Sequence, residues 1–314
     1  MTGVSRRAFT SGALAMAGLG LWRNGAMANP NGLPIGIQLF MVREDMKKDF
    51  EGTLRKIAEI GFREIESAGR SGGGQSVKQI ADFGKSVGLT LRSTHVSVPE
   101  LQSGADKVFQ DAHDAGVEYV VCAAPWPKDP SRFKTLDPSD PLIKKYGPAA
   151  PFINMLHNLN LDDWKWMVDF FNEIGAKAKA TGLTFAYHNH NFEFKKLDGI
   201  VPYDLLIEKT DPQSLSFELD CGWMVNAGLD PVDYLTKHGD RYRLLHIKDL
   251  AKGQAPGGEK TTEVGSGTID WKRIFETAKK TKVGGYYIEQ EPPFDRPALE
   301  SAQISYDYLH KLTT

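Results

Sequence analysis

Apolar and polar positions follow two alternating rhythms along most of this chain. Short apolar runs have the length of buried strands, and the segments between them carry apolar residues at helical spacing. The expected strands are Ile35–Phe40, Glu64–Glu66, Thr90–His95, Tyr119–Ala123, Thr184–His190, Leu215–Asp220, Arg243–Lys248 and Gly285–Glu289. The expected helices include Asp49–Ile60, Ser76–Val87, Ala105–Ala115, Asp162–Thr181, Asp230–Lys237 and Asp270–Thr281.

Several of the expected helices end at a glycine that is followed by an apolar residue leading into the next strand, as at Gly61, Gly88, Gly116 and Gly182. Eight units of strand followed by helix predict a parallel (β/α)8 barrel, and 314 residues suffice for such a barrel in one domain. An open, doubly wound sheet is the alternative, but no glycine-rich phosphate loop supports it.

One connection is much longer than the others. Residues 125–163, after the fourth expected strand, are rich in Pro, Asp and Lys, with Trp126, Phe133, Tyr146 and Phe152 interspersed. Connections longer than about 12–15 residues are usually functional or disordered. Because aromatic residues argue against disorder, we expect a lid over the mouth of the barrel.

The first 28 residues have the order of an export signal. Arg6 and Arg7 are followed by a weakly apolar run over residues 12–22 and then by the small residues Ala26-Met27-Ala28. The order resembles a twin-arginine signal, which carries folded proteins across the membrane. We therefore expect the barrel to occupy residues 29–314, in the periplasm, with no membrane insertion once the signal is removed.

Composition narrows the possible partners. Lys and Arg number 38 against 40 Asp and Glu, a net charge of −2, whereas nucleic-acid binding needs a basic excess. The two cysteines, Cys122 and Cys221, lie in separate strand-like runs. They are expected to be ordinary buried thiols and not a pair of metal ligands. Their spacing does not show whether they could form a disulfide. The expected partner is a small molecule, and a homo-oligomer is possible.

Polar residues gather where the expected strands end. Catalytic groups of (β/α)8 barrels lie at the carboxyl ends of the strands. Strand alternation lets His188, Asp220, His246 and Glu289 point inward together. Such a mixed set of nitrogen and oxygen ligands suits Mn²⁺, Zn²⁺, Co²⁺ or Fe²⁺ better than Mg²⁺ or Ca²⁺. Other residues near the strand ends are expected to bind substrate: Gln38, Arg43, Glu66, His95, His190 and, in the long connection, Trp126.

Residues from about Pro34 to Leu312 resemble the sugar phosphate isomerase/epimerase family of xylose-isomerase-like barrels. The resemblance rests on six stretches in order: GIQLFMVR, YHNHNFEF, LDCGWMVNAGLDP, LLHIKDL, EVGSGTIDW and YYIEQEP. It implies one divalent metal held by Glu, Asp, His and Glu from strands five to eight. Asp220, His246 and Glu289 match the last three positions. His188 occupies the first, and Glu193, in the next loop, is the alternative fourth ligand.

That departure bears on the reaction. Family epimerases use both ligand glutamates as bases, and this chain retains one, Glu289. A single base and a metal suit proton abstraction α to a carbonyl, followed by β-elimination, or the reverse hydration. The stretch Tyr-His-Asn-His is similar to lyases and hydratases of 3-keto sugars and glycosides. Glu289 or Glu193 is the expected base, and a His or Lys248 the expected proton donor.

Other classes of protein remain as alternatives. The first is a sugar isomerase or epimerase, and the second is a non-catalytic periplasmic sugar-binding protein. A metal-dependent abasic-site endonuclease, from a related barrel family, is disfavoured by the net charge of −2 and by the export signal.

Overall fold

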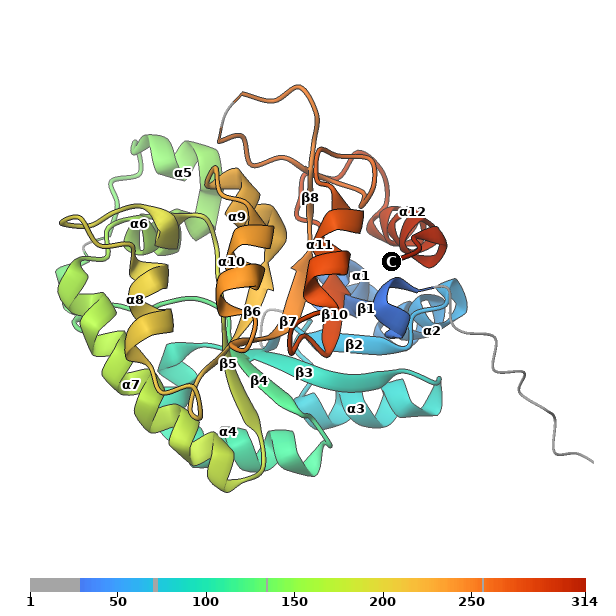
Figure 1. The fold of residues 1–314 in the computed structure, drawn as a ribbon, viewed down its shortest axis with the longest axis horizontal. Coiled ribbons are helices and arrows are strands. Elements are labelled where there is room, and N and C mark those ends of the chain that lie inside the picture. Colours follow the sequence, from blue (N-terminus) through green and yellow to red (C-terminus); the bar gives the residue numbers. More distant parts are fainter. Residues whose placement is uncertain (1–28, 70–72, 134, 256) are drawn as a thin grey trace, which may run out of the picture.

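The computed structural model describes residues 29–69, 73–133, 135–255 and 257–314; the expected signal, residues 1–28, lies outside the described residues. Eight parallel strands close into a barrel, and helices surround it (Figure 1). The barrel strands are β1 (Gly36–Gln38), β2 (Glu64–Ser67), β3 (Thr90–Val96), β4 (Tyr119–Cys122), β5 (Thr184–His188), β6 (Ser216–Asp220), β7 (Tyr242–Ile247) and β10 (Gly285–Ile288). Their order around the barrel is β1-β10-β7-β6-β5-β4-β3-β2, which confirms the predicted (β/α)8 fold.

The helices follow the strands in the expected alternation. They are α1 (Arg43–Lys48), α2 (Phe50–Ile60), α3 (Val77–Ser86), α4 (Val98–Asp114), α5 (Pro141–Tyr146), α6 (Ala150–His157), α7 (Leu161–Ala180), α8 (Pro202–Lys209), α9 (Cys221–Asn226), α10 (Pro231–His238), α11 (Trp271–Ala278) and α12 (Ala298–Lys311). Short 3-10 turns add η1 (Pro30–Gly32), η2 (Leu39–Val42), η4 (Pro130–Arg132), η5 (Gly147–Ala149) and η6 (Phe192–Phe194). A short antiparallel pair, β8 (Asp249–Leu250) and β9 (Thr261–Thr262), follows β7. None of the described helices combines the length and apolar character needed to cross a bilayer.

Strand alternation divides the core into two parts. The larger part lies between the strands and the helices and includes Tyr187. The smaller part consists of Val121, Ala186, Leu244 and Tyr287 and fills the inside of the barrel. Since Ala186 and His188 are two residues apart on β5, both point inward, and His188 lies nearer the carboxyl end.

Two of the differences from the predicted bounds have a visible local cause. β5 ends at His188, two residues early, because the Asn189 side chain bonds the backbone of Asp220 at both its N–H (3.0 Å) and its carbonyl (3.2 Å). α4 begins at Val98 rather than near Ala105, since Ser97 and Glu100 form a capping box. A capping box was visible in the sequence as Ser-x-x-Glu.

The long connection after β4 is folded. It contains η4, α5, η5 and α6, at the upper left of Figure 1. Asp163 at the start of α7 anchors it by accepting a hydrogen bond from the Lys128 backbone (3.0 Å) and pairing with Arg132. The Trp126 and Phe152 rings lie 6.4 Å apart. The described residues of the connection are therefore built of short helices and turns, and its role as a lid stays a prediction.

Candidate metal centre

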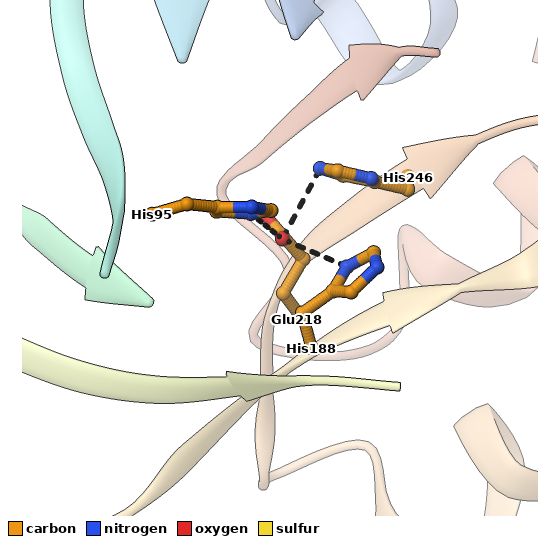
Figure 2. A group of neighbouring side chains, drawn as sticks. All are labelled: His95, His188, Glu218 and His246. Carbon is orange, nitrogen blue, oxygen red and sulfur yellow. Dashed lines mark hydrogen bonds and ion pairs between the residues drawn. The ribbon is translucent and has the colours of Figure 1, made fainter. Parts of the chain in front are cut away.

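Buried histidines and carboxylates cluster where the barrel strands end. They form two overlapping groups of four residues. Each residue offers one nitrogen or oxygen atom, and within a group these four atoms lie within 4.8 Å of one another. One group is His188, Asp220, His246 and Glu289, which is the set predicted from the sequence. The other is His95, His188, Glu218 and His246 (Figure 2).

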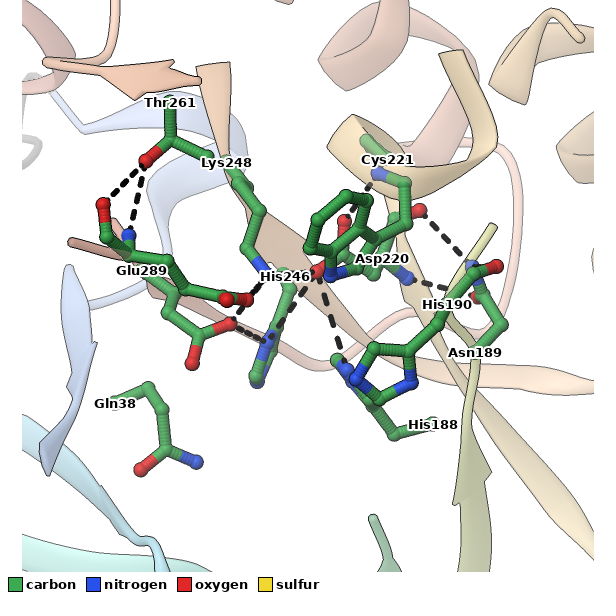
Figure 3. A network of polar contacts seen from close by, with 12 residues as sticks. Gln38, His188, Asn189, His190, Asp220, Cys221, His246, Lys248, Thr261 and Glu289 are labelled. Carbon is green, nitrogen blue, oxygen red and sulfur yellow. Dashed lines mark hydrogen bonds and ion pairs between the residues drawn. The ribbon is translucent and has the colours of Figure 1, made fainter. Parts of the chain in front are cut away.

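The first group, which we call the ligand group, converges on Asp220 (Figure 3). Nε2 of His188 and Nδ1 of His246 each lie 3.9 Å from Oδ2 of Asp220. Nδ1 of His246 is also 3.1 Å from Oε2 of Glu289. The other oxygen of Asp220, Oδ1, caps α9 by accepting the N–H of Trp223 at 2.7 Å, and this contact turns Oδ2 into the group.

Glu218 connects the second group. Its Oε2 lies 2.9 Å from Nε2 of His95, 3.1 Å from Nδ1 of His188 and 3.1 Å from Nε2 of His246 (Figure 2). His188 and His246 therefore each turn one ring nitrogen toward Glu218 and the other toward Asp220. Metal-binding histidines are commonly held in this way, with the second nitrogen bonded to a carboxylate.

The ligand group fits a divalent transition metal. Asp220 Oδ2 is buried and makes no hydrogen bond, although Nζ of Lys248 lies 3.0 Å away as an ion pair. Burial and the charge of His246 hold the pKa of His188 well below its ordinary value, so this imidazole is neutral, as a ligand must be. Burial acts to lower the pKa of His246, but Glu218 and Glu66 hold it well above its ordinary value, so His246 would release its proton when a metal binds. Two imidazoles and two carboxylates are typical ligands of zinc and similar ions. Glu218, already bonded to three imidazoles, is better explained as support for the ligand group.

Lys248 balances the charge of the cluster. Its Nζ lies 2.9 Å from Glu289 and 2.7 Å from Glu291, and 4.6 Å above the Trp223 ring. Burial acts to lower the pKa of Lys248, but Asp220, Glu289 and Glu291 hold it well above the ordinary value. The side chain is fully buried and is not among the described residues that line the adjoining cavity. This position disagrees with the expected role of Lys248 as proton donor, because it keeps its proton and does not face the cavity.

Glu193 belongs to neither group, so its contacts do not favour the expected role as base or fourth ligand, which stays a prediction. Its carboxylate accepts hydrogen bonds from Tyr187 Oη at 2.7 Å and from the backbone N–H of His190 at 3.0 Å. Tyr187 points away from the barrel interior, into the core beneath the helices. Burial raises the pKa of Glu193 to about 7. The residue fixes the loop after β5 and thereby places His190.

A cavity of about 540 Å³ opens beside the ligand group. His188 and Glu289 lie at this cavity, together with Glu291. Of the expected substrate-binding residues, His95, His190 and Trp126 also line it. Because the ligand group reaches the cavity through His188 and Glu289, a bound substrate can contact it.

The other three expected substrate-binding residues have different positions. Gln38 is fully buried and donates a hydrogen bond to Oε1 of Glu66 at 2.7 Å. Glu66, also fully buried, lies 2.7 Å from Nε2 of His246. Glu66 therefore orients the His246 ring, and Gln38 orients Glu66. Arg43 donates a hydrogen bond to the carbonyl of Phe40 and lies over its ring at 4.0 Å. It is not among the described residues that line the cavity, and its contact with substrate stays a prediction.

Sequence reasoning missed Glu218 and Ser93. Glu218 precedes Asp220 by two residues on β6, and Ser93 precedes His95 by two residues on β3. Ser93 donates a short hydrogen bond to Glu66. Since residues two apart on a strand share a face, strand alternation would have found both. The prediction considered only the last inward residue of each strand.

The loops after β7 and β10 are each fixed by one buried polar side chain, Asp249 and Thr261. The Asp249 carboxylate accepts hydrogen bonds from the backbone of the EVGSGTIDW stretch and from the indole of Trp271 at 2.9 Å. Thr261 Oγ1 bonds both the N–H (3.0 Å) and the carbonyl (2.9 Å) of Glu291 (Figure 3). These contacts hold Glu291, and with it Lys248, against the ligand group.

The fold agrees with the known proteins to which the chain is similar. The chain belongs to the xylose isomerase-like TIM barrel family, whose model matches residues 54–312. An inosose dehydratase from Clostridium perfringens is 27% identical over 180 residues, covering 52% of this chain and 60% of that protein. The chain spans about 50–60% of the length of the curated relatives it matches.

Solved structures share the fold over most of the chain. A sugar phosphate isomerase/epimerase from Parabacteroides distasonis is 25% identical, with a TM-score of 0.66, covering 88% of this chain and 94% of that chain. The IOLI protein, solved with a bound zinc atom, is 14% identical, with a TM-score of 0.62, covering 90% of this chain and 100% of that chain.

Proposed function

We propose that this protein is a divalent-metal-dependent enzyme that removes a proton α to the carbonyl of a keto sugar and eliminates an oxygen substituent from the β position. The substrates are 3-keto sugars or their glycosides. The observation that carries the proposal is the buried ligand group of His188, Asp220, His246 and Glu289, open to a cavity through His188 and Glu289. Similarity to inosose dehydratases supports it, since dehydration is an elimination of this kind.

Glu289 is the base. Burial acts to raise its pKa, but Lys248 and His246 hold the pKa of Glu289 well below the ordinary value, so the carboxylate is ionised. His246 and Lys248 both contact the same oxygen of Glu289, Oε2. Oε1 is the oxygen that takes the proton from the substrate. A divalent ion, when bound, supplies a Lewis acid that polarises the carbonyl.

His95 is the proton donor. Burial acts to lower the pKa of His95, but the carboxylates of Glu66 and Glu218 raise it to about 9, so the ring is charged at pH 7 and faces the cavity. In the reaction the α C–H bond breaks, a C=C bond forms and the β C–O bond breaks, and the leaving oxygen takes its proton from His95. Burial and Lys248 lower the pKa of His190 to about 3, so His190 is a neutral hydrogen-bonding partner for a sugar hydroxyl.

A sugar isomerase or epimerase is the second candidate, favoured by the similarity to the Parabacteroides structure. Both candidates are tested by incubating the metal-loaded protein with 3-keto-glucosides in D₂O and following the reaction by NMR. We expect deuterium at the α carbon and an unsaturated or hydrated product. Two stereoisomers with no eliminated product would favour the epimerase. Absence of exchange with every keto sugar would overturn the proposal in favour of a sugar-binding protein. The control is Asp220→Ala, which should lose metal by elemental analysis and show no exchange.

Export to the periplasm by the twin-arginine route is part of the proposal. It is supported by the order of charged, apolar and small residues over residues 1–28. Cell fractionation tests it. The wild-type chain should be found in the periplasm, shortened to begin near Asn29, and the double change Arg6→Lys with Arg7→Lys should keep it in the cytoplasm. Equal distribution of the two proteins would contradict this route.

A further inference from the structure

The cavity extends beyond the ligand group to an apolar outer part. Trp126 and Phe152 line it, together with Phe40, Val98 and Pro99. Its volume of about 540 Å³ lies within the range of roughly 300–1,000 Å³ found for sites that enclose drug-sized ligands. A single sugar ring held at His188 and Glu289 would leave this outer part unfilled.

We propose that the outer part, formed by Trp126 and Phe152, binds the second half of a glycoside, a ring with an apolar face that leaves when the glycosidic bond is eliminated. This rests on the proposed function and names its substrate class. In a 3-keto-glycoside the proton comes from C2, a double bond forms between C1 and C2, and the C1–O bond breaks. The departing group is then the alcohol carried at C1, so the outer part must hold it.

The two aromatic rings are suited to this task. Their centroids are 6.4 Å apart and their planes are inclined by 33°. Phe152 is 42% exposed, and among the described residues only it and Ile200 are exposed large hydrophobic side chains. Because Phe152 both lines the cavity and is exposed, an apolar ring of a bound ligand would cover part of it. Stacking against apolar ring faces is a favourable contact for Trp and Phe.

The connection that carries these rings is fixed at two places. Near the start of the connection, the backbone of Lys128 and the side chain of Arg132 bind the carboxylate of Asp163. Farther along, Lys145 Nζ and Tyr146 Oη each lie 3.3 Å from Glu259 in the loop between β8 and β9. Trp126 and Phe152 are therefore positioned before a ligand arrives, as a binding surface requires.

The test compares kcat/KM of the metal-loaded enzyme for phenyl, glucosyl and methyl 3-keto-β-glucosides. In Trp126→Ala and Phe152→Ala, the preference for phenyl over methyl should fall roughly 3–10-fold, the size of one aromatic contact. Trp166→Ala is the matched control, because Trp166 is half-buried on α7, stacks on Phe170 at 5.1 Å and is not a lining residue. It should keep the wild-type preference. If the preference for glucosyl over methyl falls in these variants as well, the outer part also accepts a sugar ring. If only the preference for phenyl over methyl falls, the outer part accepts an aromatic ring.

A binding measurement separates this inference from the proposed function. Calorimetry with unoxidised phenyl β-glucoside needs no turnover, and we expect binding by the wild type and by Trp166→Ala that weakens 3–10-fold in Trp126→Ala. If no keto sugar reacts but this pattern holds, the proposed reaction fails and the outer site stands. An unchanged phenyl preference, or equal binding by Trp126→Ala and the wild type, would overturn the outer site.

Discussion

Glu218 and His188 are register partners on the neighbouring strands β6 and β5, and Oε2 of Glu218 lies 3.1 Å from Nδ1 of His188. This contact fixes the imidazole so that Nε2 points to Asp220. The same oxygen contacts His246, the other histidine of the ligand group. One buried carboxylate thus orients both nitrogen ligands.

The first prediction concerns this support. Glu218→Gln should weaken metal binding about 10–100-fold, because the amide lacks the charge and the free lone pairs that bond three imidazoles. Competition with a chromophoric zinc chelator measures the affinity. The matched control is Glu64→Gln, the same change at a carboxylate that pairs with Arg92 at 3.0 Å and is not in either group. If both variants bind zinc as the wild type does, Glu218 has no positioning role.

The second prediction separates the two expected bases. Glu289→Gln should slow solvent deuterium exchange about 10²–10⁴-fold, the usual cost of removing a general base. Glu193→Gln should retain most of the activity, since the Glu193 carboxylate is bonded to Tyr187 and to the backbone of its loop and is not a member of the ligand group. Both are compared at saturating metal, with metal content checked by elemental analysis. A large loss in Glu193→Gln with full metal would show that the base is misassigned.

The sequence predicted the barrel and the ligand group because both depend on local signals. Helix ends, strand lengths and the inward face of each strand are visible from residue spacing. Residue spacing does not show which residues of two neighbouring strands lie side by side, because this register depends on the stagger with which the barrel closes. His188 lies beside Glu218, and Asp220 beside His246. The contacts of Glu193 could not be predicted for a related reason. β5 stops at His188, and in the loop that follows, the Glu193 carboxylate bonds the hydroxyl of Tyr187.

The third prediction concerns the thiols. Cys122 and Cys221 are free and fully buried, which confirms the expectation from the sequence. Burial raises the pKa of Cys122 to about 12 and the pKa of Cys221 well above its ordinary value. Since only the thiolate reacts, neither should react with a disulfide reagent at pH 8 in the folded protein, and both should do so after denaturation. Rapid reaction of the native protein would contradict the burial of these two side chains.

The last prediction tests how α7 packs on the barrel. A Cβ built on Gly175 would lie 1.9 Å from the carbonyl oxygen and 2.8 Å from the Cα of Ser214, in the turn before β6. Alanine favours helices by about 1 kcal/mol over glycine, but a clash with backbone costs about 1–3 kcal/mol or more, because the turn cannot rotate away as a side chain would. Gly175→Ala should therefore lower the free energy of unfolding, measured by urea denaturation. Gly104→Ala is the control for an added methyl group without a clash. Gly104 lies at the kink of α4, where its backbone is extended (φ 176°), no atom lies within 4 Å of its added Cβ, and its stability should stay within about 0.5 kcal/mol of the wild type. A Gly175→Ala variant as stable as Gly104→Ala would mean that α7 can move from the turn at little cost.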